Sequence, residues 1–301
     1  MLAMVSLAVL MAPAVITTGG LDTAYQKLKD AVAAKDAAQV KVLAVQTRAL
    51  AREVITAPAP AGEDEAKGWN DRVTFAHDVE QYSDYALYAT AVGARPEVTV
   101  DLLGALEQQS PKSKYLADAY GMYFRALQQT GQAAKIPPIA EKAVESFPDN
   151  DDLLAVLAES AIARKQSDRA LGYARRLTAV LEKRGRPEGV SAADWDRKRS
   201  AELASGYWIA GVVRAEKGSY FEADKDLRAA LPLVAGNDAR KAAALFYLGL
   251  ANYQLGKMTM NKAQVLEGAK FSREAAAIQG PLAQQAWHNA MVMKDEASRM
   301  R

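Results

Sequence analysis

The fold of this chain is decided by residues 114–184, which read KYLADAYGMYFRALQQTGQAAKIPPIAEKAVESFPDNDDLLAVLAESAIARKQSDRALGYARRLTAVLEKR. Small and apolar residues recur every three or four positions, which is the spacing of an amphipathic helix. The stretch divides into two consecutive units of about 34 residues, each with the order helix, turn, helix. The first unit begins near Ala117 and closes at Pro148, and the second begins at Asp151. Stacked pairs of antiparallel helices are therefore the expected architecture.

The same helical periodicity extends over the rest of the chain in both directions. Prolines and glycines separate the periodic segments, because proline interrupts a helix and glycine favours its end. Before the two units we expect helices over 21–54 (with a break near Lys35), 65–93 and 97–109. After them we expect helices over 191–216 and 222–231, then a pair from Asp238 with its turn at Leu255-Gly256-Lys257, and a lone helix over 281–298. Ser191 and Asp194 have the spacing of a helix-capping box.

The sequence suggests four segments. Residues 1–20 are apolar and uncharged, and Ala12-Pro13-Ala14 resembles a signal-peptidase site, so they are expected to be a signal peptide or an N-terminal anchor. Residues 21–56 form an N-terminal helical pair, 57–66 a Pro/Ala-rich linker, and 67–301 the main helical array. Residues 1–20 lack a Lys or Arg before their apolar core, which a signal peptide usually has, and a buried helix is therefore the alternative for them. We expect an exported protein of the periplasm or cell envelope, with a cytoplasmic location as the alternative.

The composition offers little chemistry. The chain has no cysteine, which excludes disulfides, thiol nucleophiles and cysteine–zinc sites. The net charge is only +2 and no strong basic block is present, so the sequence lacks the clustered Lys and Arg residues typical of nucleic-acid-binding proteins. The two histidines, His77 and His288, lie far apart, and the acidic run 149–152 lacks the ligand spacing of a calcium loop and is expected to cap a helix. We therefore expect no enzyme activity, no cofactor, no metal and no nucleic-acid partner, and a membrane contact only through an uncleaved N-terminal segment.

Several units resemble the tetratricopeptide repeat family over roughly residues 80–281. The clearest match is Leu245, Leu248-Gly249 and Gly256, where the family has an aromatic or large residue, Leu-Gly and a turn. A second unit matches at Tyr207, Gly211, Gly218, Ala223, Leu227 and Ala230, and prolines close units at Pro111, Pro148 and Pro281. The resemblance implies an all-α solenoid of antiparallel helix pairs with a C-terminal capping helix, and together with the N-terminal segment it predicts an exported bacterial member of this family. It departs from the family where Leu103, Ala140, Ala174 and Leu227 replace the aromatic of the second helix.

The resemblance also implies where a partner would bind. In this family the first helices of the pairs line an inner groove, and aromatic and arginine side chains anchor interfaces. The residues expected to project into that groove are Tyr88, Arg125, Gln128, Trp208, Phe246, Tyr247 and Tyr253. The leading hypothesis is a non-enzymatic scaffold that binds a protein or peptide in this groove. The alternatives are a self-assembling homo-oligomer, a solenoid that binds a small molecule, and aromatics that only fill spaces between repeats.

Overall fold

A computed structural model describes residues 19–300, except for the side chains of residues 63 and 64. Within this range the chain forms α-helices and one short 3₁₀-helix, and no strand. Within each compact part of the chain, a helix contacts mainly the next helix and the one after that, which is the contact pattern of a solenoid. The prediction of an all-α solenoid of antiparallel helix pairs is confirmed. The predicted signal segment lies outside the described residues, apart from residues 19 and 20, which begin the first helix.

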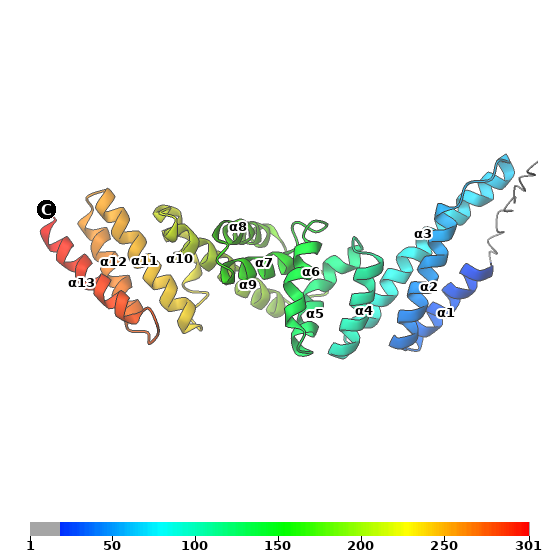
Figure 1. Cartoon of the computed structure of the whole chain (residues 1–301), viewed down its shortest axis with the longest axis horizontal. Coiled ribbons are helices and arrows are strands. Elements are labelled where there is room, and N and C mark those ends of the chain that lie inside the picture. The colour runs from blue at the N-terminus through cyan, green and yellow to red at the C-terminus, as the bar shows by residue number, and fades with distance from the viewer. Residues whose placement is uncertain (1–18, 301) are drawn as a thin grey trace, which may run out of the picture. The chain divides into compact units, whose positions relative to one another are not determined.

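The chain divides into two compact units, residues 1–131 and 132–301, which we describe separately. Unit 1 contains α1 (Gly19–Ala33), α2 (Ala37–Thr56), α3 (Glu63–Ala91), α4 (Pro96–Gln109) and α5 (Lys114–Gln129) (Figure 1). In this unit α3 packs against α1, α2, α4 and α5. The predicted linker 57–66 falls inside unit 1, where it joins α2 to α3, and its last four residues are already helical.

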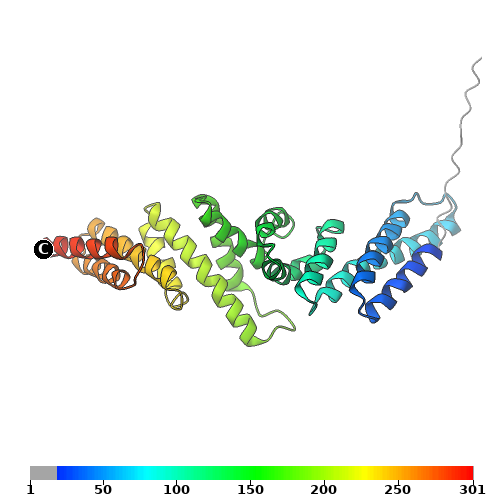
Figure 2. The ribbon, with the colours of Figure 1, turned by 60° about the horizontal axis from the view of Figure 1, so that its bottom comes forward.

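Unit 2 begins with the 3₁₀-helix η1 (Ala133–Lys135) and continues with eight α-helices. These are α6 (Ile136–Ala143), α7 (Asp151–Ala163), α8 (Ser167–Lys183), α9 (Ala192–Glu216), α10 (Tyr220–Ala230), α11 (Asp238–Met258), α12 (Lys262–Ala276) and α13 (Ala283–Arg299). The connection between α8 and α9, residues 184–191, stands away from the helices as an open loop (Figure 2). The last helix, α13, packs on α12 and α11 through Ala286, Ala290, Met293 and Ala297.

Five helix pairs reverse direction through the same local device. Two residues after the first helix of each pair ends, one residue takes the left-handed conformation, which closes the helix. These residues are Lys35, Gly93, Lys165, Gly218 and Met260, with φ between 53° and 80°. In four of the five turns the following amide donates to the carbonyl five residues earlier, as Asn261 N does to Gly256 O at 2.7 Å. The reversal of each pair is thus fixed within a few residues of chain.

A close crossing of α11 and α12 requires glycine at two positions. A Cβ at Gly249 would clash with Ser272 Oγ and stand 3.1 Å from Gly268 O, and a Cβ at Gly268 would stand 2.7 Å from Gly249 O. Gly256 was predicted to form a turn, but this prediction is wrong because α11 continues to Met258. Gly256 is instead buried inside the helix, where a Cβ would come within 2.7 Å of Val265.

Side chains cap five of the helices at their N-termini. The predicted cap at Ser191 is confirmed: its Oγ accepts from the amide of Asp194 at 3.1 Å and donates to the Asp194 carboxylate at 2.7 Å. The acidic run 149–152 also begins a helix, and the Asn150 side chain accepts from Leu153 N at 3.0 Å. No helix among residues 19–300 combines the length and apolar character required to cross a membrane.

Candidate partner-binding surface

Six aromatic side chains of unit 1 form a continuous row, which we call the tyrosine strip. The row crosses three alternate helices, of which α3 contacts both α1 and α5. Its members are Tyr25 of α1, Phe75, Tyr82, Tyr85 and Tyr88 of α3, and Tyr115 of α5. On α3, Tyr82, Tyr85 and Tyr88 are spaced by three residues, which places neighbouring rings on the same side of a helix.

The rings of the strip touch in sequence. Tyr25 meets Phe75 at a centroid distance of 5.8 Å and Tyr82 at 5.2 Å, both edge to face. Tyr82 then contacts Tyr85 at 5.9 Å, and Tyr115 contacts both Tyr85 and Tyr88 at 5.7 Å. Each such contact contributes about 0.5–1.5 kcal/mol beyond burial. The rings therefore hold one another in a defined arrangement before any partner binds.

The strip remains accessible to a partner. Tyr85 is 42% exposed, and the other five rings are partly exposed. By contrast, Tyr120, Tyr123 and Phe124 of α5 are at most 5% exposed and belong to the core. Unit 1 thus has a buried aromatic set in its core and a partly exposed row, in which Tyr25 and Phe75 also pack against core residues of α1, α2 and α3.

The tyrosine hydroxyls of the strip make no hydrogen bond to any described residue. Burial and the neighbouring Tyr25 and Tyr85 raise the pKa of Tyr82, and burial and Asp118 raise that of Tyr88. Both hydroxyls therefore keep their protons at physiological pH and can donate. Lys29 Nζ lies 4.6 Å from the ring centroid of Tyr25, and Lys114 Nζ lies 5.1 Å from that of Tyr115. Neither ammonium group pairs with a described carboxylate.

Among the residues predicted from sequence, the structure includes Tyr88 in the strip. Arg125 and Gln128 are exposed on α5, and among the described residues neither side chain forms a hydrogen bond or an ion pair with the strip. Arg125 is ten residues from Tyr115, which corresponds to about 15 Å along the helix axis. The structure therefore keeps Arg125 in unit 1 but apart from the aromatic row.

The four predicted residues of unit 2 are mostly engaged within the protein. The prediction that Phe246 projects into a groove is wrong, because it is 7% exposed and packs in a core cluster with Leu245 and Ala286. The Trp208 indole N–H donates to Arg240 O at 3.0 Å, the Tyr247 hydroxyl donates to Glu216 at 2.8 Å, and the Tyr253 hydroxyl accepts from Lys257 at 3.2 Å. Their polar groups are occupied, unlike those of the strip.

A network that the sequence does not reveal surrounds Trp208. The guanidinium of Arg240 lies 5.3 Å from the Trp208 ring centroid and pairs with Glu159 at 2.6 Å. Ser205 of α9 donates to the same carboxylate. These residues come from α7, α9 and α11, and the pair Glu159–Arg240 is separated by 81 residues, so only the stacking of alternate helices brings it together. The network ties the three helices to one another.

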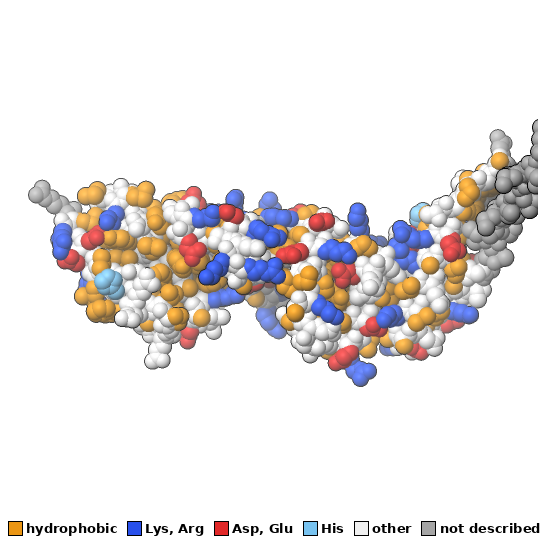
Figure 3. All heavy atoms as spheres, viewed as in Figure 1, with side chains coloured by type: hydrophobic (Ala, Val, Ile, Leu, Met, Phe, Trp, Pro, Cys, Tyr) orange, Lys and Arg blue, Asp and Glu red, His pale blue; other side chains and the backbone are white. Residues whose placement is uncertain are grey.

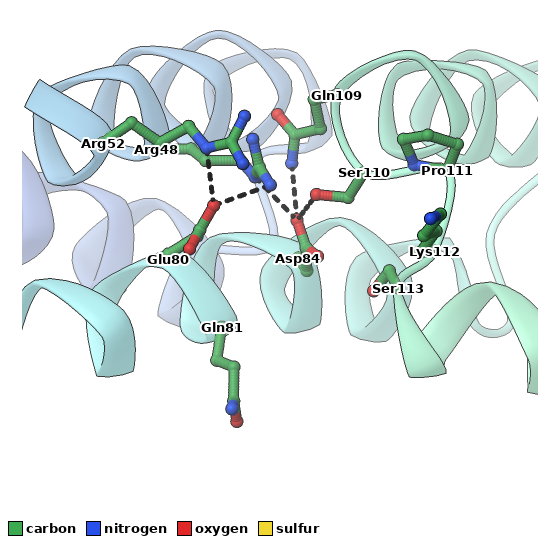
Figure 4. A pocket seen from close by; sticks show the side chains of 10 residues that line it. All are labelled: Arg48, Arg52, Glu80, Gln81, Asp84, Gln109, Ser110, Pro111, Lys112 and Ser113. Atoms are coloured by element: carbon green, nitrogen blue, oxygen red, sulfur yellow. Dashed lines mark hydrogen bonds and ion pairs between the residues drawn. The ribbon is translucent and has the colours of Figure 1, made fainter. Parts of the chain in front are cut away.

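Unit 1 also contains a polar cavity of about 440 Å³ between α2, α3 and the α4–α5 connection (Figure 4). The charged side chains of α2 and α3 point toward one another in this cavity: Arg48 pairs with Glu80 at 2.7 Å, and Arg52 pairs with the same carboxylate at 3.0 Å. Asp84 accepts from Gln109 at 3.0 Å and from Ser110 at 2.8 Å. Because these carboxylates are already satisfied, the cluster serves to join the helices of unit 1.

No family model and no curated protein matches this chain. Among residues 19–300 no group of three or more His, Cys, Asp or Glu side chains has the arrangement of a metal site. The tyrosine strip is therefore the surface of the described chain with the strongest features of a binding site.

Proposed function

We propose that the chain is a non-enzymatic scaffold that binds a polypeptide partner on the tyrosine strip of unit 1. The observation that carries this proposal is a row of six touching, partly exposed rings whose tyrosine hydroxyls make no hydrogen bond to a described residue. Tyrosine is enriched in interfaces because it offers a large contact area, loses little side-chain entropy on binding and carries one polar group. A preordered row reduces the entropy cost of association further.

The proposal keeps the assignment to the tetratricopeptide repeat family. It is supported by the stacked helix pairs and by the close crossings at Gly211 and Gly249, two positions of the family pattern. An exported location, in the periplasm or cell envelope of a bacterium, is also part of the proposal. This location rests on the apolar residues 2–16 and the Ala12-Pro13-Ala14 motif alone.

The test places a photo-crosslinking amino acid at Tyr85 in the full chain, produced in its native host. Phe221 of α10 provides the matched control, because it is an aromatic residue with 71% exposure and no place in the strip. We expect a covalent adduct with one polypeptide from position 85 and none from position 221. The absence of an adduct from position 85, or the same adducts from both positions, would contradict the proposal.

Self-association is the second candidate, and one observation favours it. The outer side of α13 exposes Trp287 (60%) and Met291 (51%), which are four residues apart and therefore neighbours on the helix surface. Hydrophobic side chains also gather over α11–α13 in the face shown in Figure 3. Sedimentation velocity over a concentration series would show oligomers that the substitution Trp287→Ser dissociates. A monomer at all concentrations would exclude this candidate.

A further inference from the structure

We propose that Met260, in the turn between α11 and α12, is a methionine oxidation site at which Lys257 and Arg299 assist the reaction with a hydroperoxide. The inference concerns unit 2 and does not depend on the tyrosine strip. Three observations support it: the exposure of the Met260 side chain, the cavity that this side chain lines, and the hydrogen-bond donors that two cations retain in that cavity.

Methionine supplies all the sulfur chemistry of this chain, because the sequence contains no cysteine. Among the described methionines, Met258 and Met260 have the most exposed side chains, at 75% and 74%, whereas Met293 of α13 is 2% exposed. A thioether is oxidised to a sulfoxide where an oxidant can reach its sulfur. Exposure therefore selects Met258 and Met260 over Met293.

Met258 and Met260 differ in their surroundings, although they are equally exposed. Met260 lines a surface cavity of about 470 Å³ together with Lys257 and, from the end of α13, Glu296, Arg299 and Met300. Met258, the last residue of α11, does not line this cavity. The two residues therefore form a matched pair, in which the exposure is constant and the neighbouring cations differ.

The two cations of the cavity retain hydrogen-bond donors. An ammonium group has three N–H donors, and that of Lys257 contacts the Tyr253 hydroxyl at 3.2 Å and Glu296 at 3.3 Å, which leaves one donor within the described residues. The hydrogen bonds to Tyr253 and Glu296 raise the pKa of Lys257, so the ammonium stays charged at neutral pH. The Arg299 guanidinium has five donors and pairs with Asp295 of its own helix at 2.6 Å. Both cations can therefore donate to a further oxygen atom.

The reaction transfers one oxygen atom from the hydroperoxide to sulfur. A lone pair of the Met260 sulfur attacks one peroxide oxygen, the S–O bond forms and the O–O bond breaks. Sulfur is oxidised by two electrons, and the departing hydroxide takes the proton of the transferred oxygen, so hydrogen peroxide is reduced to water. A donor beside the sulfur stabilises the negative charge that develops on the leaving oxygen, and it can then donate to the sulfoxide oxygen.

The position of Met260 also determines what oxidation does to the fold. A sulfoxide at this exposed residue places its polar oxygen at the surface, whereas a sulfoxide at Met293 would place it in the core. Methionine sulfoxide is reduced back to methionine by sulfoxide reductases, which would meet the product at the surface. Met260 can therefore be oxidised and restored while α11, α12 and α13 stay packed.

The experiment treats the full chain with hydrogen peroxide and follows the sulfoxide at each methionine by tandem mass spectrometry. We expect Met260 to be oxidised about five-fold faster than Met258, the effect of one hydrogen bond of about 1 kcal/mol on a rate. Sulfoxide at Met293 should appear only after both. Equal rates at Met258 and Met260, or a faster rate at Met258, would overturn the inference.

Variants and denaturant identify the origin of the preference. The double variant Lys257→Gln/Arg299→Gln should lower the Met260 rate to that of Met258, whereas Lys270→Gln, an exposed charge of α12 outside the cavity, should leave the ratio unchanged. The Met258 rate is the internal reference, and an unchanged value shows that the turn is intact. In urea the two rates should become equal. A preference for Met260 that survives the double variant or persists in urea would overturn the inference.

Discussion

The substitution of alanine for Gly249 tests the packing of unit 2 most directly. A methyl group at this position would clash with Ser272 Oγ and come within 3.1 Å of Gly268 O and 3.2 Å of Ser272 N. Gly172 provides a matched control, because it also lies inside a helix, α8, but a Cβ there meets nothing within 4 Å. The two variants therefore make the same chemical change in a crowded and in an open position.

The magnitude follows from the difference between the two variants. Replacing glycine with alanine in a helix stabilises it by about 1 kcal/mol, and this gain is common to both. Overpacking at Gly249 costs about 1–3 kcal/mol, and Gly172 has no such cost. We expect Gly172→Ala to raise the free energy of unfolding by about 1 kcal/mol and Gly249→Ala to lie about 1–3 kcal/mol below it. For domains of this size, 1 kcal/mol shifts Tm by about 2–4 °C.

Differential scanning calorimetry of the full chain measures these shifts, and urea unfolding followed by circular dichroism gives the free energies. Ser272→Ala in the Gly249→Ala background removes the nearest atom and should recover part of the lost stability. The backbone atoms at 3.1 and 3.2 Å remain, so recovery should be incomplete. If Gly249→Ala is as stable as Gly172→Ala, the close crossing of α11 and α12 is refuted.

Three further predictions concern burial, charge and backbone conformation. Phe246→Ala should destabilise the protein by about 3–5 kcal/mol, because this ring is 7% exposed, whereas Phe221→Ala at 71% exposure should change stability by less than about 0.5 kcal/mol in urea unfolding. Burial raises the pKa of Glu202 to about 8; the nearby Asp152 and Asp151 add to this shift and Lys198 opposes it. Between about pH 4.5 and pH 8 the folded state therefore holds a proton on Glu202 that the unfolded state has released. Stability is therefore lost as pH rises through about 8, and Glu202→Gln should match the wild-type Tm near pH 5 and exceed it near pH 9; a parallel pair of curves would contradict this. Met260 (φ 53°) and Gly218 (φ 80°) both take the left-handed conformation, which is costly for a residue with a Cβ. Met260→Gly should therefore raise the free energy of unfolding by up to about 1 kcal/mol, and Gly218→Ala should lower it; a change of the same sign in both variants would contradict the turn geometry.

The helices could be predicted from the sequence because their signals are local. The periodicity of apolar residues, the prolines and the cap at Ser191 each act within a few positions, and they place the pairs close to their observed bounds. The prediction that failed, a turn at Gly256, used a residue type with two meanings. Glycine ends helices, but it also permits a close helix contact, and only the position of Val265 in the next helix distinguishes the two.

The proposed binding surface is only partly predictable from the sequence. The three-residue spacing of Tyr82, Tyr85 and Tyr88 is visible in the sequence and indicates neighbouring positions on one helix, but the repeat pattern points to Tyr88 alone. Tyr25 and Tyr115 could not be added, because their contacts with α3 depend on which helices are neighbours in space. Phe246 shows the converse limit, since an aromatic residue in a first helix fills the core when its side of the helix faces α12 and α13.

The repeated left-handed turn has a consequence for how the chain folds. Because each reversal is fixed by a single residue and its neighbouring amide, a helix pair can form from contacts that are close in sequence. Topologies dominated by such short-range contacts fold quickly, since little loop-closure entropy must be lost before contacts form. Each helix pair can therefore assemble as it leaves the ribosome and offer a surface on which the next pair condenses, without waiting for the C-terminal end of the chain.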